Sequence, residues 1–326
     1  MTSIAVVILN YNGRIFLEKF LPSVINNADG CEIIVADNAS TDDSVEFLKN
    51  TYPKIRLIQL TDNQGFAGGY NETLNQVSAE YYVLLNSDVE VTPNWIRPII
   101  DLMSANKLIA ACQPKIRSFH QKTHFEYAGA AGGYIDWLGY PFCRGRIFDF
   151  YEEDLGQYND TKEVFWATGA CMFVRADVFH TLGGFDTNFF AHMEEIDLCW
   201  RMKNAGKQIF YCSNSVVFHV GGGTLHKTNP RKTFLNYRNG LSMLYKNLPA
   251  NKLVSTLLLR LILDGISGIK LLIGGSFSDF WAVIKAHFAF YAMIPKLKRN
   301  SPKTVSHIYQ KSIVWEYFVK RKRDIL

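Results

Sequence analysis

Acidic and amide side chains gather in short clusters in the first 90 residues, each directly after a run of apolar residues. The clusters are Asn10-Tyr11-Asn12-Gly13, Asp37-Asn38-Ala39-Ser40, Asp62-Asn63-Gln64-Gly65 and Asn86-Ser87-Asp88. Carboxylate and amide groups of this kind bind polar ligands, and carboxylate oxygens also bind hard divalent cations. The same residue types dominate turns, so a turn explains each cluster on its own about as well as a binding site does.

Two carboxylates in these clusters suggest different chemistry. Asp37 could accept hydrogen bonds from a ribose or from a base N–H group, and the alternative is an Asx-turn or a helix N-cap. Asp88 follows a very apolar run and could hold a cation that bridges diphosphate oxygens and neutralises the charge on a leaving group. The alternative for Asp88 is a simple turn at the end of a strand.

Three further carboxylates, Glu194, Glu195 and Asp197, fall in the first turn of an expected helix. One of them could act as a general base, since the preceding apolar residues 189–191 would shield it from water. The alternative is a favourable interaction with the helix dipole, worth about 0.3–1 kcal/mol for each acid. In that case Asp197 and Arg201, four residues apart, would form a stabilising pair.

A histidine, His219, ends the apolar run 216–220 just before three glycines. A lone histidine near a strand is most often a structural residue with its ring nitrogens hydrogen-bonded. As a neutral imidazole it could instead be a second metal ligand beside Asp88. Each of these signals is weak alone, but together and in this order they indicate a catalytic site.

The elements that would position these residues alternate between strand-like and helix-like patterns. Short apolar runs that predict strands occur at Ile4–Leu9, Ile33–Ala36, Ile55–Leu60 and Tyr81–Leu85. Helical spacing of apolar residues separates these runs, which is typical of an α/β protein whose mostly parallel sheet is covered on both faces. Ligands bind beyond the carboxyl ends of such strands, where the polar clusters fall.

The remainder of the chain is less uniform. Residues 116–164 are rich in glycine and aromatic residues and read as an insertion that shapes a pocket. Regular patterns return at Phe165–Arg175, at a helix over Glu194–Ala205 and at a strand over Ser215–Val220. Beyond Arg231 the patterns become long and helical, so we expect one domain at 1–230 and a helical, basic region at 231–326.

The distribution of charge supports this division. The 326-residue chain has a formal net charge of +5, but residues 231–326 contain 17 Lys and Arg against 4 Asp and Glu, so they carry +13 and the remainder −8. The six cysteines form no CxxC pair, which disfavours a zinc site and favours reduced cytosolic thiols. The sequence shows no signal peptide and no apolar stretch of about 18 residues, so we expect no membrane span.

Several ligand classes are disfavoured by missing motifs. The turn after the first apolar run is Asn10-Tyr11-Asn12-Gly13 instead of Gly-x-Gly-x-x-Gly, and the chain has no Walker loop. A nucleotide would therefore be bound by a different motif. The basic residues come without a recognition module for nucleic acid, which we do not expect as a partner.

The ordered motifs resemble those of family 2 glycosyltransferases with the GT-A fold, over about residues 3–245. The resemblance rests on the segments 7–13, 35–42, 63–71, 85–88, 168–170, 184–186, 194–201 and His219. Within that family the chain is most similar to the bacterial rhamnosyltransferase-like and galactofuranosyltransferase-like branch. The fold implied is a Rossmann-like, mostly parallel sheet flanked by helices.

This resemblance implies inverting transfer of a sugar from a nucleoside-diphosphate donor to a hydroxyl of a glycan or lipid-linked acceptor in bacterial surface polysaccharide assembly. It assigns Glu195 as general base, flanked by Glu194 and Asp197, and assigns Asp88 and His219 to Mg²⁺ or Mn²⁺. The nucleotide would contact Asn10, Tyr11, Asn12, Asp37, Asn38, Asn63, Gly65, Asn71 and Asn86. Two positions depart from the family pattern: Asn86 replaces the first acid of the metal motif, and Glu195 stands where many relatives have Asp.

The basic C-terminal region suggests where such an enzyme would work. Helical segments with Trp281, Phe288, Phe290 and Tyr291 favour attachment to an anionic membrane surface, at the cytoplasmic face where lipid-linked acceptors reside. The alternatives are a helical subdomain with a solvated basic face, or a contact in a homodimer.

Two other functions were weighed against glycosyl transfer. A sugar-1-phosphate nucleotidyltransferase would need a Gly-rich N-terminal loop followed by Arg, which this chain lacks. A catalytically inactive, membrane-associated scaffold for glycan assembly is disfavoured by the joint presence of Asp88, Glu195 and His219.

Overall fold

The structure is a computed structural model, and it describes residues 2–221, 229–299 and 303–323. The helices are α1 (Arg14–Asn26), α2 (Ser44–Thr51), α3 (Gly65–Leu74), α4 (Arg97–Ala105), α5 (Ala176–Thr181), α6 (Glu194–Asn204), α7 (Pro230–Asn247), α8 (Ala250–Ile273) and α9 (Phe277–Met293). The main strands are β1 (Ile4–Asn10), β2 (Glu32–Asp37), β3 (Arg56–Gln59), β4 (Tyr81–Asn86), β5 (Val89–Val91), β6 (Ile109–Ser118), β11 (Thr161–Val164), β12 (Cys171–Arg175) and β13 (Gln208–His219). The remaining strands are β7 (Gly133–Asp136), β8 (Pro141–Cys143), β9 (Arg146–Ile147), β10 (Phe150–Tyr151) and β14 (Ile308–Tyr309).

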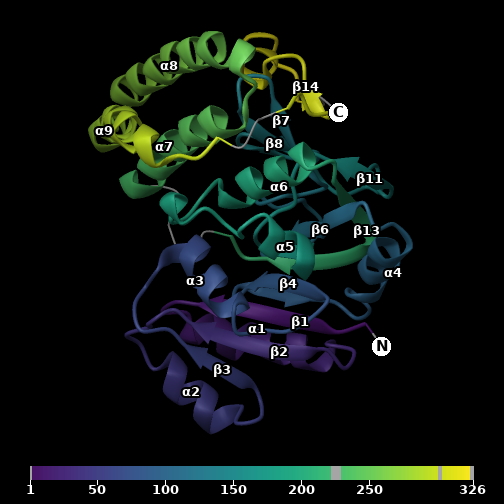
Figure 1. The fold of residues 1–326 in the computed structure, drawn as a ribbon. Helices are drawn as coiled ribbons and strands as arrows, with labels where there is room; N and C mark the ends of the chain where they lie inside the picture. The colour runs from purple at the N-terminus through teal and green to yellow at the C-terminus, as the bar shows by residue number, and fades with distance from the viewer. Residues whose placement is uncertain (1, 222–228, 300–302, 324–326) are drawn as a thin grey trace.

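The central sheet runs through the middle of the molecule in the order β11-β13-β6-β12-β4-β1-β2-β3, with β5 paired to β13 (Figure 1). The strands β4, β1, β2 and β3 pair in parallel, which confirms the predicted parallel sheet. Strand β12 runs antiparallel between β4 and β6. Because Asn10 lies opposite Asp37 and Leu9 opposite Asn86, the polar residues that follow these strands meet at one edge of the sheet.

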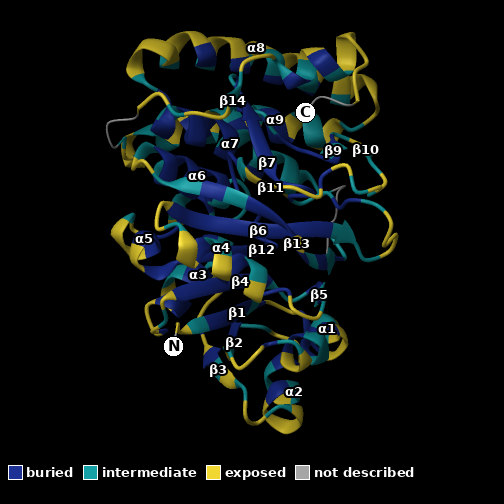
Figure 2. Cartoon of the chain, turned by 90° about the vertical axis from the view of Figure 1, so that its right-hand side faces the viewer, coloured by how far each residue is buried: buried dark blue, intermediate teal, exposed yellow. Residues whose placement is uncertain are grey.

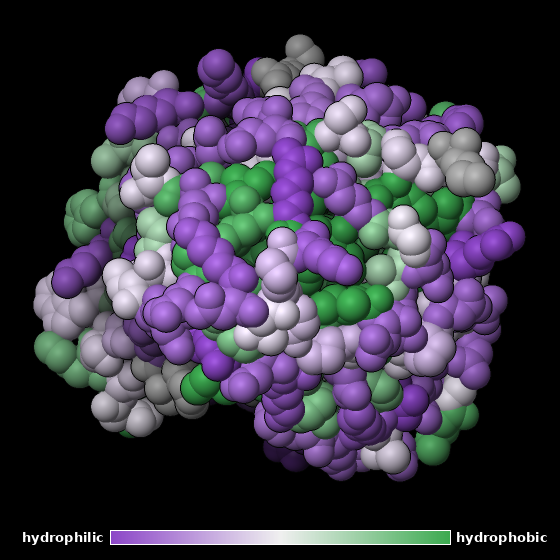
Figure 3. All heavy atoms as spheres, turned by 90° about the horizontal axis from the view of Figure 1, so that it is seen from below, coloured by the Kyte–Doolittle hydropathy of each residue, from purple (hydrophilic) through white to green (hydrophobic). Residues whose placement is uncertain are grey.

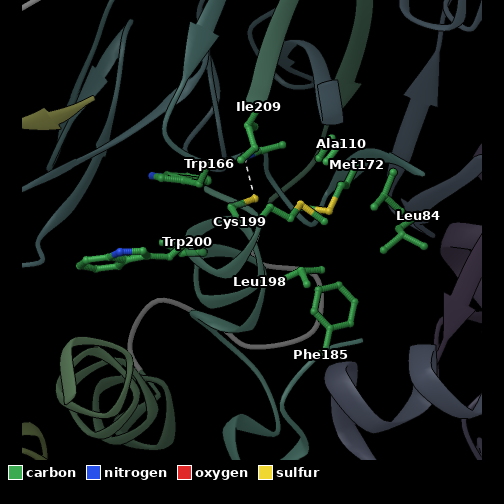
Figure 4. Packing of buried hydrophobic residues seen from close by; sticks show 14 of the residues in the cluster. Leu84, Ala110, Trp166, Met172, Phe185, Leu198, Cys199, Trp200 and Ile209 are labelled. Atoms are coloured by element: carbon green, nitrogen blue, oxygen red, sulfur yellow. Dashed lines mark hydrogen bonds between the residues drawn. The ribbon is translucent and has the colours of Figure 1, made fainter. Parts of the chain in front are cut away.

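The core lies on both faces of this sheet because its central strands are apolar throughout. Along β4, Tyr82 and Leu84 pack into one hydrophobic cluster, and Val83 and Leu85 into the other. Burying an aliphatic side chain of this size contributes about 1.5–3 kcal/mol. Helix α6 is fixed against one face by Leu198, Cys199 and Trp200, which pack near Trp166 and Ile209 (Figure 4).

The insertion at 116–164 is more regular than its sequence suggested. It supplies β7 to β10 of a second sheet with the order β10-β9-β8-β7-β14. Strand β14 comes from the C-terminal region and pairs in parallel with β7. The buried carboxylate of Asp136, at the end of β7, also accepts a hydrogen bond of 3.0 Å from the backbone N–H of Ile313. The C-terminal segment is therefore anchored to the insertion, a contact that local sequence patterns do not reveal.

The C-terminal helices cover one end of the molecule, with α8 outermost (Figure 1). The expected boundary at residue 231 coincides with the start of α7, where the side chain of Asn229 accepts a hydrogen bond from the N–H of Arg231. Helix α7 packs on α6 and α9. Helix α8 instead exposes much of its length (Figure 2). No helix in the described part of the chain is both long enough and apolar enough to span a bilayer.

The opposite end of the molecule has a different surface. Seen from the end that carries β3 and α2, the molecule is mainly hydrophilic, with apolar residues visible in the middle between polar ones (Figure 3). All six cysteines are unpaired in the structure, and five of them are buried.

Candidate active site

A large cleft lies at the carboxyl ends of β1 and β4, where the polar clusters were expected to meet. Its volume is about 2010 Å³. One side is formed by residues that follow the strands: Tyr11, Asn12, Gly13, Asn38, Asn63, Gly65, Asn86, Ser87 and Asp88. The insertion, the start of α6, and helices α7 and α8 form the other sides, so the predicted role of residues 116–164 in shaping a pocket is confirmed.

The amide side chains at the strand ends hold the cleft edge in shape. The Nδ2 group of buried Asn38 donates to Asn63 Oδ1 (3.1 Å) and to the carbonyl of Gly65 (3.0 Å). The side chain of Asn12 accepts from the N–H of Thr41 (2.7 Å). These bonds tie together the turns after β1, β2 and β3, and they leave exposed faces that a ligand can contact.

Gly65 connects this edge to the loop before α6. Its backbone has φ +70°, and a Cβ atom there would lie 2.5 Å from the carbonyl oxygen of Phe190. That carbonyl accepts hydrogen bonds from the N–H groups of Phe66 and Ala67. Only glycine fits both the left-handed conformation and the close approach, so the first turn of α3 fixes the position of Phe190.

Asp88 and His219 lie side by side in the cleft because of the pairing between β5 and β13. His219 lies opposite Val89 in this ladder, and the N–H of Val220 donates to the carbonyl of Asp88. The His219 Nε2 atom is 3.2 Å from Asp88 Oδ1. The two residues are 131 positions apart in the sequence, yet they meet as the sequence analysis expected.

The other ring nitrogen of His219 contacts a residue that the sequence analysis missed. Nδ1 lies 2.9 Å from Oε2 of Glu126, which is buried and belongs to the insertion. Burial alone would lower the pKa of His219, but Asp88 and Glu126 together raise it well above its usual value. Burial would likewise raise the pKa of Asp88, but the facing His219 lowers it, so the carboxylate stays ionised.

These residues fit a divalent cation, which would replace the proton that Asp88 and Glu126 favour on His219. A carboxylate that orients a metal-binding histidine through the second ring nitrogen is the usual partner of such a ligand, and Glu126 occupies that position. Among the residues that the structure describes, no group of three or more His, Cys, Asp and Glu side chains is placed to hold a metal ion. Two protein ligands suit Mg²⁺ or a similar ion, because substrate phosphates and water commonly complete its shell.

The loop before α6 is held in a strained conformation at the opposite wall of the cleft. Phe190, His192 and Met193 all have positive φ, which is costly for residues with a side chain. The Nδ2 group of Asn239, fully buried in α7, contacts the carbonyls of Phe189 (3.0 Å), Ala191 (2.9 Å) and His192 (2.7 Å). Helix α7 therefore stabilises the backbone that delivers the first turn of α6 to the cleft.

Two carboxyl groups of that first turn, Glu194 and Glu195, line the cleft. Their Oε2 atoms are buried, and neither atom has a hydrogen-bond partner among the described residues. Burial raises the pKa of Glu195 to about 7. Burial and the neighbouring Glu195 raise the pKa of Glu194 well above its usual value, which favours its uncharged form. A carboxyl group with a pKa near 7 can both accept and release a proton under physiological conditions.

The comparisons with known proteins identify the family of this chain. A family model described as "Glycosyl transferase family 2" matches residues 5–183, which include β1 to β4 and Asp88. The chain belongs to glycosyl transferase family 2. It is 27% identical over 230 residues to the N-acetylglucosaminyl-diphospho-decaprenol L-rhamnosyltransferase of Mycobacterium tuberculosis, covering 66% of this chain and 75% of that protein. The protein is therefore a glycosyltransferase.

Solved structures of glycosyltransferases share the GT-A fold with this chain. GalNAc-T7 with UDP, GalNAc and Mn²⁺ matches with a TM-score of 0.59 at 16% identity, over 76% of this chain and 48% of that one. The chain thus spans about half the length of GalNAc-T7. The mannosyltransferase PcManGT from Pyrobaculum calidifontis, in complex with GDP-Man and Mn²⁺, matches with a TM-score of 0.54 at 14% identity, over 89% and 87% of the two chains.

Not every residue proposed for nucleotide contact faces the cleft of this glycosyltransferase. Asp37 is buried, and its carboxylate accepts from Asn10 Nδ2 (3.1 Å) and from the N–H of Ser40 (2.9 Å), which is the turn that the sequence analysis kept as an alternative. The amide of Asn71 donates to the carbonyl of Phe185 and accepts from its N–H. Asn10, Asp37 and Asn71 thus support the residues around the cleft, and the structure places none of them in its lining.

Asp197 also differs from the expectation. It is fully buried, lies outside the cleft lining, and pairs with Arg201 Nε (2.8 Å) and Lys246 Nζ (2.8 Å). Asn247 Nδ2 donates to its other oxygen at 2.8 Å. Burial would raise the pKa of Asp197, but Arg201 and Lys246 lower it. Its geometry favours the stabilising ion pair over a catalytic role, and the ion pair joins α6 to α7.

We expect Asp197→Ala to lower the free energy of unfolding by about 3–5 kcal/mol, because it leaves Arg201 and Lys246 without a buried partner. Urea denaturation followed by circular dichroism measures this change. Asp101→Ala is a matched control, since Asp101 pairs with Arg97 at the same four-residue spacing but on an exposed surface. Its loss should stay below about 1 kcal/mol. Equal losses in the two variants would contradict a buried network at Asp197.

One further residue of the cleft had no signal in the sequence. His192 lies in its lining, and burial, together with the nearby charge of Lys232, lowers the pKa of His192 to about 4. Its Nε2 atom is buried and has no hydrogen-bond partner among the described residues. A neutral imidazole at this place can exchange hydrogen bonds with sugar hydroxyls.

Proposed function

We propose that this glycosyltransferase moves a sugar from a nucleoside-diphosphate donor to a hydroxyl of a glycan or lipid-linked acceptor, with inversion at the anomeric carbon. One observation carries the proposal: Glu195, with its pKa near 7, lines the same cleft as the Asp88 and His219 pair. A base and a diphosphate site in one cleft are what an inverting displacement needs. The relative from M. tuberculosis, named for L-rhamnosyl transfer to a lipid diphosphate, supports this class of reaction.

The donor would bind along the strand ends. Tyr11, Asn12, Asn38, Asn63 and Asn86 line that side of the cleft and offer ring, amide and carbonyl groups to a nucleoside. The donor diphosphate would then lie beside Asp88 and His219. A Mg²⁺ or Mn²⁺ ion held by these two residues would neutralise the negative charge that develops on the leaving diphosphate. Two of the solved structures with this fold contain Mn²⁺ together with a nucleotide or nucleotide sugar, which supports this site.

The acceptor would bind between the donor sugar and α6. As its hydroxyl oxygen forms a bond to the anomeric carbon, the bond from that carbon to the diphosphate oxygen breaks, and Glu195 takes the hydroxyl proton. A positioned base of this kind contributes about 10²–10⁴-fold. The strained loop at 190–193 and the hydrogen bonds from Asn239 would keep this carboxylate in place before the acceptor arrives.

The proposal is tested by incubating the protein with single nucleoside-diphosphate sugars and Mn²⁺ or Mg²⁺, while released nucleoside diphosphate is measured. We expect one donor or a few related donors to be hydrolysed slowly and to raise the melting temperature, since a ligand that binds only the folded state stabilises it. An inactive scaffold would hydrolyse none of them. A nucleotidyltransferase would release no nucleoside diphosphate, and with added inorganic diphosphate it would instead convert the nucleoside-diphosphate sugar into nucleoside triphosphate and sugar 1-phosphate.

The pH dependence of turnover should report the pKa of Glu195. Because the base must be deprotonated, kcat/KM should rise about tenfold per pH unit below pH 7 and level off above it. Glu194 is the titratable group nearest to Glu195 in sequence, and Cys143 and Cys199 also interact electrostatically with Glu195. Initial rates at subsaturating acceptor between pH 5 and 9 give the profile. A flat profile through pH 7 would remove Glu195 from the base role.

We further propose that the C-terminal helices rest on an anionic membrane surface at the inner face of the cell membrane. The buried stripe of α8 is polar or small and consists of Thr256, Arg260, Asp264 and Gly268. Most of its exposed residues are instead apolar and include Val254, Leu258, Leu259, Ile262, Ile269 and Ile273. This inverted pattern is typical of a helix whose apolar face is covered by something outside the chain, and the net charge of +13 on residues 231–326 favours anionic lipid over a second basic copy.

Placing two charges on this face, with Leu258→Glu and Ile262→Glu together, should lower binding to vesicles of phosphatidylglycerol at least tenfold. The reason is the loss of apolar contact and the added repulsion from anionic lipid. Cosedimentation with the vesicles measures the bound fraction. Leu155→Glu changes an even more exposed leucine on the insertion and should have no effect. Unchanged binding of the α8 variant would contradict membrane contact through this helix.

A further inference from the structure

The cleft is larger than a nucleotide sugar requires. Pockets for small ligands are commonly about 300–1,000 Å³, whereas this one has about 2010 Å³ and continues beyond α6 to the inner side of α8. The far half is bounded by α8 on one side and by the C-terminal segment 312–319 on the other. Its walls carry the apolar side chains of Leu263, Ile266, Leu271, Trp315, Phe318 and Val319.

These apolar walls are not covered by other parts of the chain. The exposed fractions are 58% for Ile266, 55% for Trp315 and 47% for Phe318. Large aromatic and aliphatic side chains that gather in a concave surface and stay in contact with water usually mark a ligand or partner site. The far half of the cleft therefore suits an apolar ligand.

A polar network fixes which residues of α8 border this space. Asp264, fully buried, accepts from Tyr140 Oη (3.0 Å) and from Arg260 Nε (2.8 Å), and Arg260 also donates to the carbonyl of Leu138. These bonds fix the rotation of α8 about its axis. Because the polar stripe is the one that packs inward, residues such as Leu263 and Ile266 face the cleft instead of a hydrophobic core.

The lining of the cleft also contains basic side chains. Arg146, Lys232 and Lys270 all belong to it. In the described ranges of the chain none of these three forms an ion pair with a carboxylate, and Lys270 Nζ lies 4.3 Å from the ring centre of Phe318. Positive groups without an acidic partner, beside an apolar wall, match a ligand that joins an anionic group to an apolar chain.

We infer that the far half of the cleft binds the lipid part of the acceptor, an isoprenoid chain linked through a diphosphate to the sugar that receives the new residue. The inference rests on the proposed function, because that function places the acceptor sugar at Glu195. The chain would lie between α8 and segment 312–319, the diphosphate near Arg146, Lys232 and Lys270, and the acceptor hydroxyl at Glu195. Continuity with the catalytic cleft and the basic residues in its lining favour this occupant over a second copy of the protein.

Isothermal titration calorimetry on the full chain tests the site with three soluble probes: farnesyl diphosphate, geranyl diphosphate and inorganic diphosphate. We expect farnesyl diphosphate to bind at least about tenfold more tightly than geranyl diphosphate, because a longer chain buries more apolar surface. Inorganic diphosphate should bind more weakly than either. Equal affinity for all three would mean binding at the donor diphosphate position alone and would overturn the inference.

Paired variants separate this site from the membrane face of the same helix. Ile266→Glu, in the cleft wall, should weaken farnesyl diphosphate at least tenfold, whereas Ile262→Glu, one turn earlier, equally exposed and outside the lining, should leave it unchanged. Equal losses in the two variants, or dissociation of a dimer by Ile266→Glu without a change in probe binding, would overturn the inference. The probes are measured without a donor, so their failure to bind would refute the lipid site alone. Absence of donor turnover would refute the proposed function instead.

Discussion

Glu195→Gln should reduce sugar transfer by about 10²–10⁴-fold while the affinity for the donor stays within about twofold. Glutamine has the size of glutamate and can fill the same space, but it cannot accept the proton of the acceptor hydroxyl. The donor is proposed to bind on the other side of the cleft, at the strand ends, so its contacts are not altered. Single-turnover transfer and calorimetric titration of the unreactive nucleoside diphosphate measure the two quantities separately.

The adjacent residue provides the control. Because burial and the charge of Glu195 raise the pKa of Glu194 well above its usual value, its uncharged form is favoured, and Glu194→Gln resembles that form. We expect this variant to keep activity within about tenfold of the parent protein. The reverse result, with Glu195→Gln near normal and Glu194→Gln inactive, would move the base to Glu194. Loss of activity in both with normal donor binding would indicate that the pair acts together.

The part of the site that lies at strand ends could be predicted because it depends on local pattern. Apolar runs ending at Leu9, Ala36 and Leu85 predicted parallel strands, and parallel pairing brings their polar successors to one edge. Sequence order alone, however, could not tell which of these polar groups point into the cleft. Asp37 and Asn71 have the expected residue type and place, but their hydrogen-bonding capacity is used by neighbouring protein groups.

The parts that escaped prediction depend on contacts between distant segments. Glu126 lies in an irregular, glycine-rich stretch, 93 residues before His219, and nothing around it resembles a motif. The pairing of β14 with β7 joins segments that are more than 170 residues apart. The sequence predicted α8 as a long helix with many apolar residues. It did not show that these residues point outward, which follows from the buried pair of Arg260 and Asp264.

These distant contacts also change how the two predicted regions relate. The acidic body and the basic C-terminal region differ in charge, and sequence alone suggested that chemistry belongs to the first and location to the second. Helix α7 connects them, since its Asn239 hydrogen-bonds the loop before α6 and its Lys246 pairs with Asp197 of α6. The proposed base, Glu195, is therefore positioned by the same helical region that we propose to rest on the membrane.

Asp88→Asn should lower activity by about 10³-fold and weaken the binding of Mn²⁺. The substitution keeps the shape of the side chain but removes the only carboxylate in Asn86-Ser87-Asp88, and a bound cation of this kind contributes several kcal/mol to a developing diphosphate charge. Titration of Mn²⁺ in the presence of the nucleoside diphosphate, followed by electron paramagnetic resonance, reports binding without any turnover. Asp62→Asn, at the end of β3 and outside the cleft lining, should change neither quantity.

Glu126→Gln separates the metal ligands from the residue that orients them. A glutamine can still contact His219 Nδ1 through its carbonyl oxygen but no longer supplies a charge, so we expect a loss of about 10–100-fold in Mn²⁺ affinity, smaller than that of Asp88→Asn. Excess Mn²⁺ should restore much of the activity of Glu126→Gln and little of that of Asp88→Asn. Activity that is indifferent to EDTA and survives Asp88→Asn would refute the metal site, and the diphosphate charge would then have to be stabilised by basic side chains such as Arg231 and Lys232, which line the same cleft.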